Sequence, residues 1–119
     1  MAWGNFRNLR VWVRARDLAV HVCRVTNEPS FRRDWSLRDQ MRRAAVSVPS
    51  NIAEGNERRS GREAAHFLAV AKGSLAELAT QLEIAQALDL IDWERSNALQ
   101  GECGEIDRML AALMAFHGG

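Results

Sequence analysis

Residues 60–88, with the sequence SGREAAHFLAVAKGSLAELATQLEIAQAL, decide the fold class of this chain. Ser60 and Glu63 form an S-x-x-E capping box, which marks the start of a helix. Apolar residues then recur at alternating spacings of three and four: Leu68, Ala71, Leu75, Leu78, Leu82 and Ala85. This spacing is the a/d seam of left-handed helix bundles. We predict a helix from Gly61 to Leu88, roughly 42 Å long. A glycine inside a helix costs about 1 kcal/mol, so we expect Gly73 to mark a close helix–helix approach.

Two further segments, one near each end of the chain, have helical periodicity. One runs from about Asn8 to Thr26, and its apolar face consists of Trp12, Ala15, Leu18, Val22 and Val25. The other runs from about Asp92, a suitable N-cap, to Phe116, and its apolar face consists of Leu99, Cys103, Ile106, Leu110 and Leu113. The connections are short, so neighbouring helices are expected to run antiparallel. The expected fold is all-α, an up-and-down antiparallel four-helix bundle made by residues 1–119 as one domain.

The remaining helix is expected to start near Ser36, with Asp39 as a capping-box-like partner. Its apolar stripe consists of Leu37, Met41, Ala44, Val48 and Ile52. Pro49 lies inside this stripe, where it removes one backbone donor and crowds the carbonyl four residues earlier. Either the helix ends at Val48 and Asn51 caps a new turn, or one kinked helix continues to Gly55. The stripe keeps its phase across the proline, so we favour the kinked helix.

Charge is distributed unevenly along this chain of 119 residues. The 16 basic and 15 acidic residues leave a net charge of +1, which argues against an overall basic nucleic-acid-binding protein but not against a local basic patch. Residues 1–62 hold thirteen arginines and six acidic residues, whereas residues 63–119 hold three basic and nine acidic residues. The two halves are expected to attract each other, either within the fold or between subunits.

Two groups of arginines are candidates for contacts with RNA or DNA. Arg7, Arg10 and Arg14 fall on one side of the first helix, and Arg58, Arg59 and Arg62 cluster at the second connection. Further arginines, Arg38, Arg42 and Arg43, occur on the second helix. A basic stripe is typical of a nucleic-acid interface, because guanidinium groups bind phosphates. The alternative is a solvated helix surface with internal salt bridges, and the absence of interleaved aromatic residues argues against base stacking.

The outer stripe of the helix at residues 61–88 is unusually rich in small residues. It consists of Ala65, Ala69, Lys72, Ala76, Thr80, Glu83 and Ala87. A solvated helix face usually carries more charge. We therefore take the alanines at 65, 69, 76 and 87 as candidates for an oligomer interface, the alternative being that alanine is simply a good helix former.

No combination of residues predicts catalysis, a metal site or a cofactor. Glu63 and His66 match one E-x-x-H motif, but the second motif that a di-iron bundle needs is missing. His21 and Cys23 lie two residues apart, which places them on different helix faces. No glycine-rich phosphate loop occurs. We therefore expect a protein that is not an enzyme.

The sequence also predicts a cytoplasmic location without membrane insertion. No stretch of about 18 apolar residues occurs, and the N-terminus lacks the apolar run of a signal peptide. The two cysteines, Cys23 and Cys103, have no metal-ligand spacing and are interpreted as buried thiols in a reducing compartment.

Two stretches of the chain resemble a known protein family. They are residues 40–55, QMRRAAVSVPSNIAEG, and residues 67–85, FLAVAKGSLAELATQLEIA, and the start Phe6-x-x-Leu9-x-Val11-Trp12 fits too. Both resemble the four-helix bundle proteins encoded within intervening sequences of bacterial 23S ribosomal RNA genes. The resemblance implies a cytosolic homopentameric ring and kinship with the accessory protein of diversity-generating retroelements, which works with a reverse transcriptase and nucleic acid. It supplies no catalytic residues, and it implies structural or interface roles for the motif positions Arg42, Arg43, Asn51 and Glu54.

Two functional hypotheses remain at this point. The first is a non-enzymatic homo-oligomeric bundle that binds nucleic acid or a nucleoprotein partner. The alternative is a scaffold that binds only protein. The two differ in whether arginine-rich surfaces come together in the assembled protein.

Overall fold

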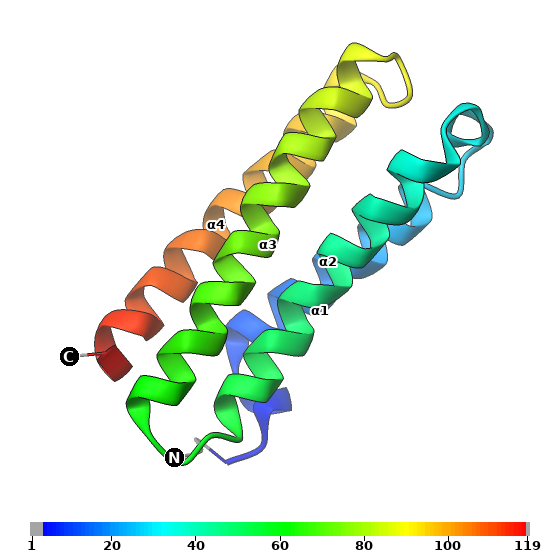
Figure 1. Ribbon diagram of the computed structural model, residues 1–119. Helices are drawn as coiled ribbons and strands as arrows, with labels where there is room; N and C mark the ends of the chain where they lie inside the picture. The colour runs from blue at the N-terminus through cyan, green and yellow to red at the C-terminus, as the bar shows by residue number, and fades with distance from the viewer. Residues whose placement is uncertain (1–3, 119) are drawn as a thin grey trace.

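The computed structural model describes residues 4–118 of the chain, and all regular secondary structure in that range is helical. The four α-helices are α1 (Arg10–Val25), α2 (Trp35–Asn56), α3 (Gly61–Ala87) and α4 (Trp93–Gly118), and the two short 3-10 helices are η1 (Phe6–Asn8) and η2 (Pro29–Arg33). The α-helices run alternately up and down, so the predicted antiparallel bundle is confirmed (Figure 1). Helices α1 and α2 form one side of the bundle, and α3 and α4 form the other.

The core follows the predicted apolar stripes and lies along the axis of a molecule of 44 × 20 × 18 Å. All six predicted seam residues of α3 are at most 2% exposed. The stripes of α1 and α2 are buried as well, apart from the half-buried Trp12 and Val25 at the margin. Burying apolar area of this kind provides the main stabilisation of such a bundle. The heptad spacing therefore predicted the core correctly.

Three helices begin with a side chain that accepts a hydrogen bond from a backbone N–H of the first turn. Ser60 accepts from the N–H of Glu63, and Asp92 accepts from the N–H of Arg95, both as predicted. Helix α2 starts at Trp35, close to the predicted start near Ser36, but the predicted cap was wrong: Asp34 is the cap and accepts from the N–H of Leu37 at 3.0 Å. Its carboxylate is also favoured by the helix dipole at this position, which a serine hydroxyl is not.

Helix α2 continues through Pro49 to Asn56, so the alternative in which it ends at Val48 is wrong. Asn51 does not cap a new turn. Its side-chain amide instead donates to the carbonyl of Ser47 within the same helix, at 2.8 Å. Buried residues on both sides of the proline hold the helix in place, because Val48 and Ile52 are both fully buried in the core.

The expected close approach at Gly73 was wrong within this chain, since a Cβ at this position would meet no atom within 4 Å. The close approach lies at Gly55 instead. A Cβ there would lie 3.2 Å from the carbonyl oxygen of Ala64 and 3.3 Å from the Cβ of Phe67. Gly55 therefore sets how closely the end of α2 packs against the start of α3.

Candidate nucleic-acid interface

One end of the bundle collects both chain ends and the α2–α3 connection (Figure 1). The side-chain amide of Asn56 donates to the carbonyl of Gly4 at 2.9 Å, which ties the N-terminal segment to the end of α2. A Cβ on Gly61 would lie 2.6 Å from the carbonyl of His117, so the start of α3 touches the end of α4. We call this the terminal end. It brings together five of the six candidate arginines from two distant segments: Arg7, Arg10, Arg58, Arg59 and Arg62.

Two of these arginines are held by their neighbours. Arg58 donates to a carboxylate oxygen of Glu54 at 2.8 Å, and its guanidinium lies 4.9 Å from the centre of the Phe67 ring. Arg7 donates to the side-chain oxygen of Asn5 at 3.2 Å and stacks on Phe6, and it pairs with no carboxylate of the described residues. Arg58 is thus largely neutralised, whereas Arg7 keeps an uncompensated charge.

The other three arginines at the terminal end are exposed. The guanidinium groups of Arg10, Arg59 and Arg62 make no hydrogen bond or ion pair within residues 4–118. Two exposed glutamates lie close to them in the sequence: Glu57 is two residues before Arg59 on the α2–α3 connection, and Glu63 follows Arg62 in the first turn of α3. The arginines make the charge of the terminal end positive but modest, because Glu57, Glu63 and, near Arg10, Glu105 partly offset them.

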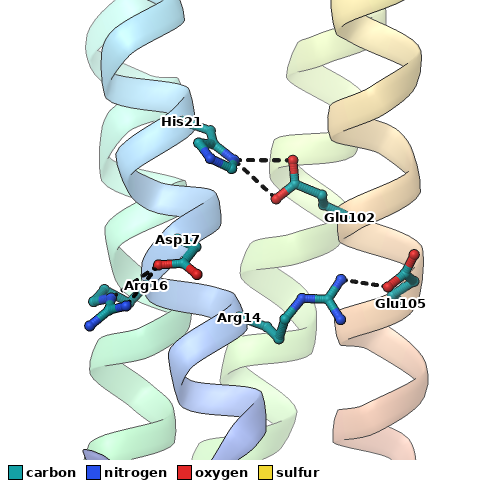
Figure 2. A network of polar contacts seen from close by, with 6 residues as sticks. All are labelled: Arg14, Arg16, Asp17, His21, Glu102 and Glu105. Atoms are coloured by element: carbon teal, nitrogen blue, oxygen red, sulfur yellow. Dashed lines mark hydrogen bonds and ion pairs between the residues drawn. The ribbon is translucent and has the colours of Figure 1, made fainter.

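Arg14 does not belong to this surface. It lies further along α1, where it donates to the carboxylate of Glu105 on α4 at 2.5 Å (Figure 2). This hydrogen bond lowers the pKa of Glu105, and the nearby charges of Arg14, Arg108 and Arg10 act in the same direction. His21 contacts Glu102 on the same pair of helices at 3.1 Å. The predicted stripe of Arg7, Arg10 and Arg14 is therefore split, because Arg14 joins α1 to α4.

Two other arginines from the basic half hold the C-terminus of α1. Arg42 donates to the hydroxyl of Thr26 at 2.9 Å and to the carbonyl of Cys23 at 3.1 Å. Arg38 donates to the carbonyl of Thr26 at 3.2 Å. The last carbonyls of a helix lack partners within the helix and carry partial negative charge, so cations are favoured there. Arg42 thus has the structural role that the resemblance implied.

Two further motif positions also make intramolecular contacts. Asn51 donates to the hydroxyl of Ser47 at 3.0 Å, and this hydroxyl lies 2.8 Å from that of Ser74 on α3. Glu54 pairs with Arg58, as described above. Arg43 differs, because it is exposed and makes no hydrogen bond or ion pair with any described residue. Of the three arginines of α2 that were considered as part of a basic stripe, Arg38 and Arg42 are held at the C-terminus of α1. Only Arg43 is available to a partner.

The alanine stripe of α3 is only partly exposed. Ala69, Ala76 and Ala87 are exposed, whereas Ala65 is half-buried. Lys72, from the same stripe, donates to Asp107 of α4 at 2.7 Å. The stripe therefore borders α4, and the fully outward face of α3 lies to one side of it.

The residues considered for other chemistry are dispersed. No group of three potential metal ligands occurs among the described residues, and Glu63 and His66 are both exposed. Burial raises the pKa of the Cys103 thiol to about 12. Cys23 is only half-buried, contrary to the expectation that both thiols are buried. None of the described helices is both long and apolar enough to cross a membrane.

Comparison with known protein families and with solved structures gives matches. The model of a family described as 23S rRNA-intervening sequence protein matches residues 7–112. A solved structure of a protein of unknown function from the S23 ribosomal protein family of Bacteroides thetaiotaomicron is similar, with a TM-score of 0.80 and 20% sequence identity over 87% of this chain and 97% of that chain. A search among curated proteins finds no match. At 20% identity, the structural likeness shows a shared fold.

Proposed function

Since this chain belongs to the family of 23S rRNA-intervening sequence proteins, we propose that it is a non-enzymatic bundle that associates with copies of itself and binds nucleic acid, alone or within a nucleoprotein. The expected assembly is the pentameric ring that the resemblance implies, and the expected location is the cytoplasm. The single observation that carries the proposal is the set of arginines at the terminal end that form no ion pair with any described residue: Arg7, Arg10, Arg59 and Arg62.

Guanidinium groups suit this role because they donate two parallel hydrogen bonds to a phosphate. Contacts with phosphates carry no sequence information, so the binding is expected to be largely independent of sequence. One subunit offers only a few phosphate contacts. A ring of identical subunits repeats these contacts around its axis, which raises the overall affinity by multivalency.

The test is fluorescence anisotropy with a labelled RNA and a labelled DNA duplex at about 50 and about 200 mM salt. Each phosphate contact on a duplex makes the affinity fall about 3.5-fold over this range, because a bound counterion is released per contact. The variant Arg59→Ala/Arg62→Ala is expected to weaken binding and to lower the log–log salt slope by about 1.8 per subunit engaged.

The matched control is Arg32→Ala/Arg108→Ala. Both of these arginines are exposed, lie outside the two segments that carry the candidate arginines and make no hydrogen bond with any described residue. This variant loses the same net charge and is expected to keep the wild-type slope. Equal weakening by the two variants would indicate a diffuse effect of net charge. No binding at the lower salt would remove the nucleic-acid proposal and leave the protein-only scaffold.

A further inference from the structure

A hollow of about 570 Å³ lies at the terminal end, between the start of α1 and the end of α4 (Figure 1). Its apolar lining includes Leu9 and Val11 from the start of α1, and Met109, Leu113 and Phe116 from α4. Leu9, Met109 and Leu113 are partly buried against the core, whereas Phe116 is 70% exposed. Pockets of about 300 to 1,000 Å³ are large enough to hold small organic groups. We call this surface the terminal hollow.

The charged side chain in the lining of the terminal hollow is an arginine. Arg10 is exposed, and its guanidinium makes no hydrogen bond or ion pair within residues 4–118. The hydrogen bond from Arg14 lowers the pKa of Glu105, and the charge of Arg10 adds to this effect, so Arg10 lies near Glu105 without a hydrogen bond to it. None of the described residues that line the hollow is acidic. The terminal hollow is therefore complementary to a ligand that has both an apolar part and an anionic part.

A second cation lies close to the end of α4. The backbone of His117 touches Gly61 at the start of α3, and Arg62 follows Gly61 in the chain. His117 also follows Phe116, and the two rings meet edge to face with their centres 5.6 Å apart. The terminal hollow is thus continuous with the arginine surface of the terminal end rather than separate from it.

An unpaired nucleobase with its phosphate matches this combination of groups. The base is a flat ring that can stack on Phe116, and the phosphate is an anion for Arg10. Proteins that bind single strands combine a positively charged groove with aromatic side chains on which bases stack. The arginines of the first half of the sequence have no interleaved aromatic residues, but the fold brings Phe116 to them from the other end of the chain. A purely apolar ligand would leave the charge of Arg10 without a counterpart.

We propose that the terminal end binds single-stranded nucleic acid in preference to a duplex, with one unpaired base stacked on Phe116 in the terminal hollow. Arg10 holds the phosphate of that nucleotide, and Arg62 holds another phosphate of the same strand. A base within a duplex would first have to leave the stack, which costs free energy. The proposal rests on the nucleic-acid binding proposed above and names the form of nucleic acid. Every base has a ring face, so stacking is compatible with binding that is largely independent of sequence.

Fluorescence anisotropy with three labelled probes tests this site. The probes are a single strand, the same strand with abasic sites, and a duplex of the same sequence, each made as RNA and as DNA. The abasic strand keeps the phosphates but lacks the bases that stack. The wild type is expected to bind the intact strand at least about 5-fold more tightly than the abasic strand, in one or both sugar forms. Phe116→Ala is expected to remove this difference and to keep the log–log salt slope, because no charge is lost.

Further variants separate stacking from simple apolar contact. Phe116→Trp keeps a ring and is expected to keep the preference for the intact strand, whereas Phe116→Leu keeps only apolar volume and is expected to lose it. Trp93→Ala is the matched control, because it removes a side chain that is 63% exposed at the opposite end of α4. This control is expected to leave all three affinities unchanged. Circular dichroism verifies that each variant is folded.

The outcomes distinguish this site from the function on which it rests. Absence of binding to every probe would overturn the nucleic-acid function and the site together. Salt-dependent binding with equal affinities for the intact strand, the abasic strand and the duplex would overturn only the site. A Phe116→Ala variant that loses self-association in ultracentrifugation, while it keeps the preference for the intact strand, would assign the terminal hollow to contacts between copies and would also overturn the site.

Discussion

Replacing Arg42 with alanine is expected to destabilise the bundle strongly, although the side chain is only half-buried. The change removes the hydrogen bonds from Arg42 to Thr26 and Cys23 at the C-terminus of α1. Hydrogen bonds to a charged group contribute about 1.5 to 3 kcal/mol each, and the interaction with the helix dipole adds about 0.3 to 1 kcal/mol. Allowing for partial exposure, we expect the free energy of unfolding to fall by about 2 to 4 kcal/mol.

The assay is urea unfolding followed by far-UV circular dichroism at one fixed protein concentration, since self-association would also affect the midpoint. With a slope near 1.5 kcal/mol/M, the midpoint is expected to fall by about 1 to 3 M. Arg42→Lys keeps the charge but loses the geometry that allows two hydrogen bonds at once, so its midpoint is expected to lie between those of the wild type and of Arg42→Ala. Arg108→Ala removes an exposed arginine from α4 and is expected to cost less than about 0.5 kcal/mol. Equal midpoints for Arg42→Ala and Arg108→Ala would refute the anchoring role.

Three other predictions concern single sites. Gly101→Ala is expected to raise the free energy of unfolding by about 1 kcal/mol, because its Cβ enters open space. Gly61→Ala is expected to lower the free energy of unfolding, because its Cβ forces α3 away from the carbonyl of His117. Thermal unfolding compares the two variants. Arg14→Ala is expected to raise the pKa of Glu105 towards its ordinary value, as seen by carboxyl NMR titration. Since the pKa of Glu105 is lowered in the folded state, its contact with Arg14 stabilises the fold above the pKa of Glu105 in the unfolded chain. This stabilisation is lost as the pH falls through the pKa of Glu105 in the folded state. An unchanged titration of Glu105 in the Arg14→Ala variant would contradict the prediction. Cys103, with a pKa of about 12, is expected to react with a thiol reagent only on unfolding, and rapid reaction of Cys103 in the native protein, identified by peptide mapping, would disprove its protection.

The sequence predicted those features that depend on residues close together in the chain. The α3 core was correct because burial repeats with the helical period, as in Leu68 and Leu75. The continuation of α2 through Pro49 was also correct, since the apolar stripe keeps its phase there. The cap of α2 was displaced, because Asp34 and Ser36 are both suitable caps and only the backbone geometry of Asp34 distinguishes them.

The candidate site was harder to predict because the partners of its arginines lie far away in the sequence. Arg42 contacts residues 16 and 19 positions earlier, and Arg14 contacts Glu105, which is 91 positions away. Periodicity places an arginine on a helix face, but it does not predict whether a carbonyl or a carboxylate of another helix lies within hydrogen-bond distance of that face. Of the thirteen arginines in residues 1–62, the side chains of six donate to a backbone carbonyl or a carboxylate among the described residues, and those of seven do not.

The even number of helices has a consequence for any assembly with cyclic symmetry. An up-and-down bundle of four helices returns the end of its last helix to the level at which its first helix begins (Figure 1). In a ring whose axis runs along the helices, every copy places residues 4 and 118 at the same face and the 26–34 and 88–92 turns at the opposite face. The two faces of such a ring therefore differ. A fluorescent protein fused to either tail would crowd the arginine side five-fold in a pentamer, so labels intended to leave that side open belong in the turns.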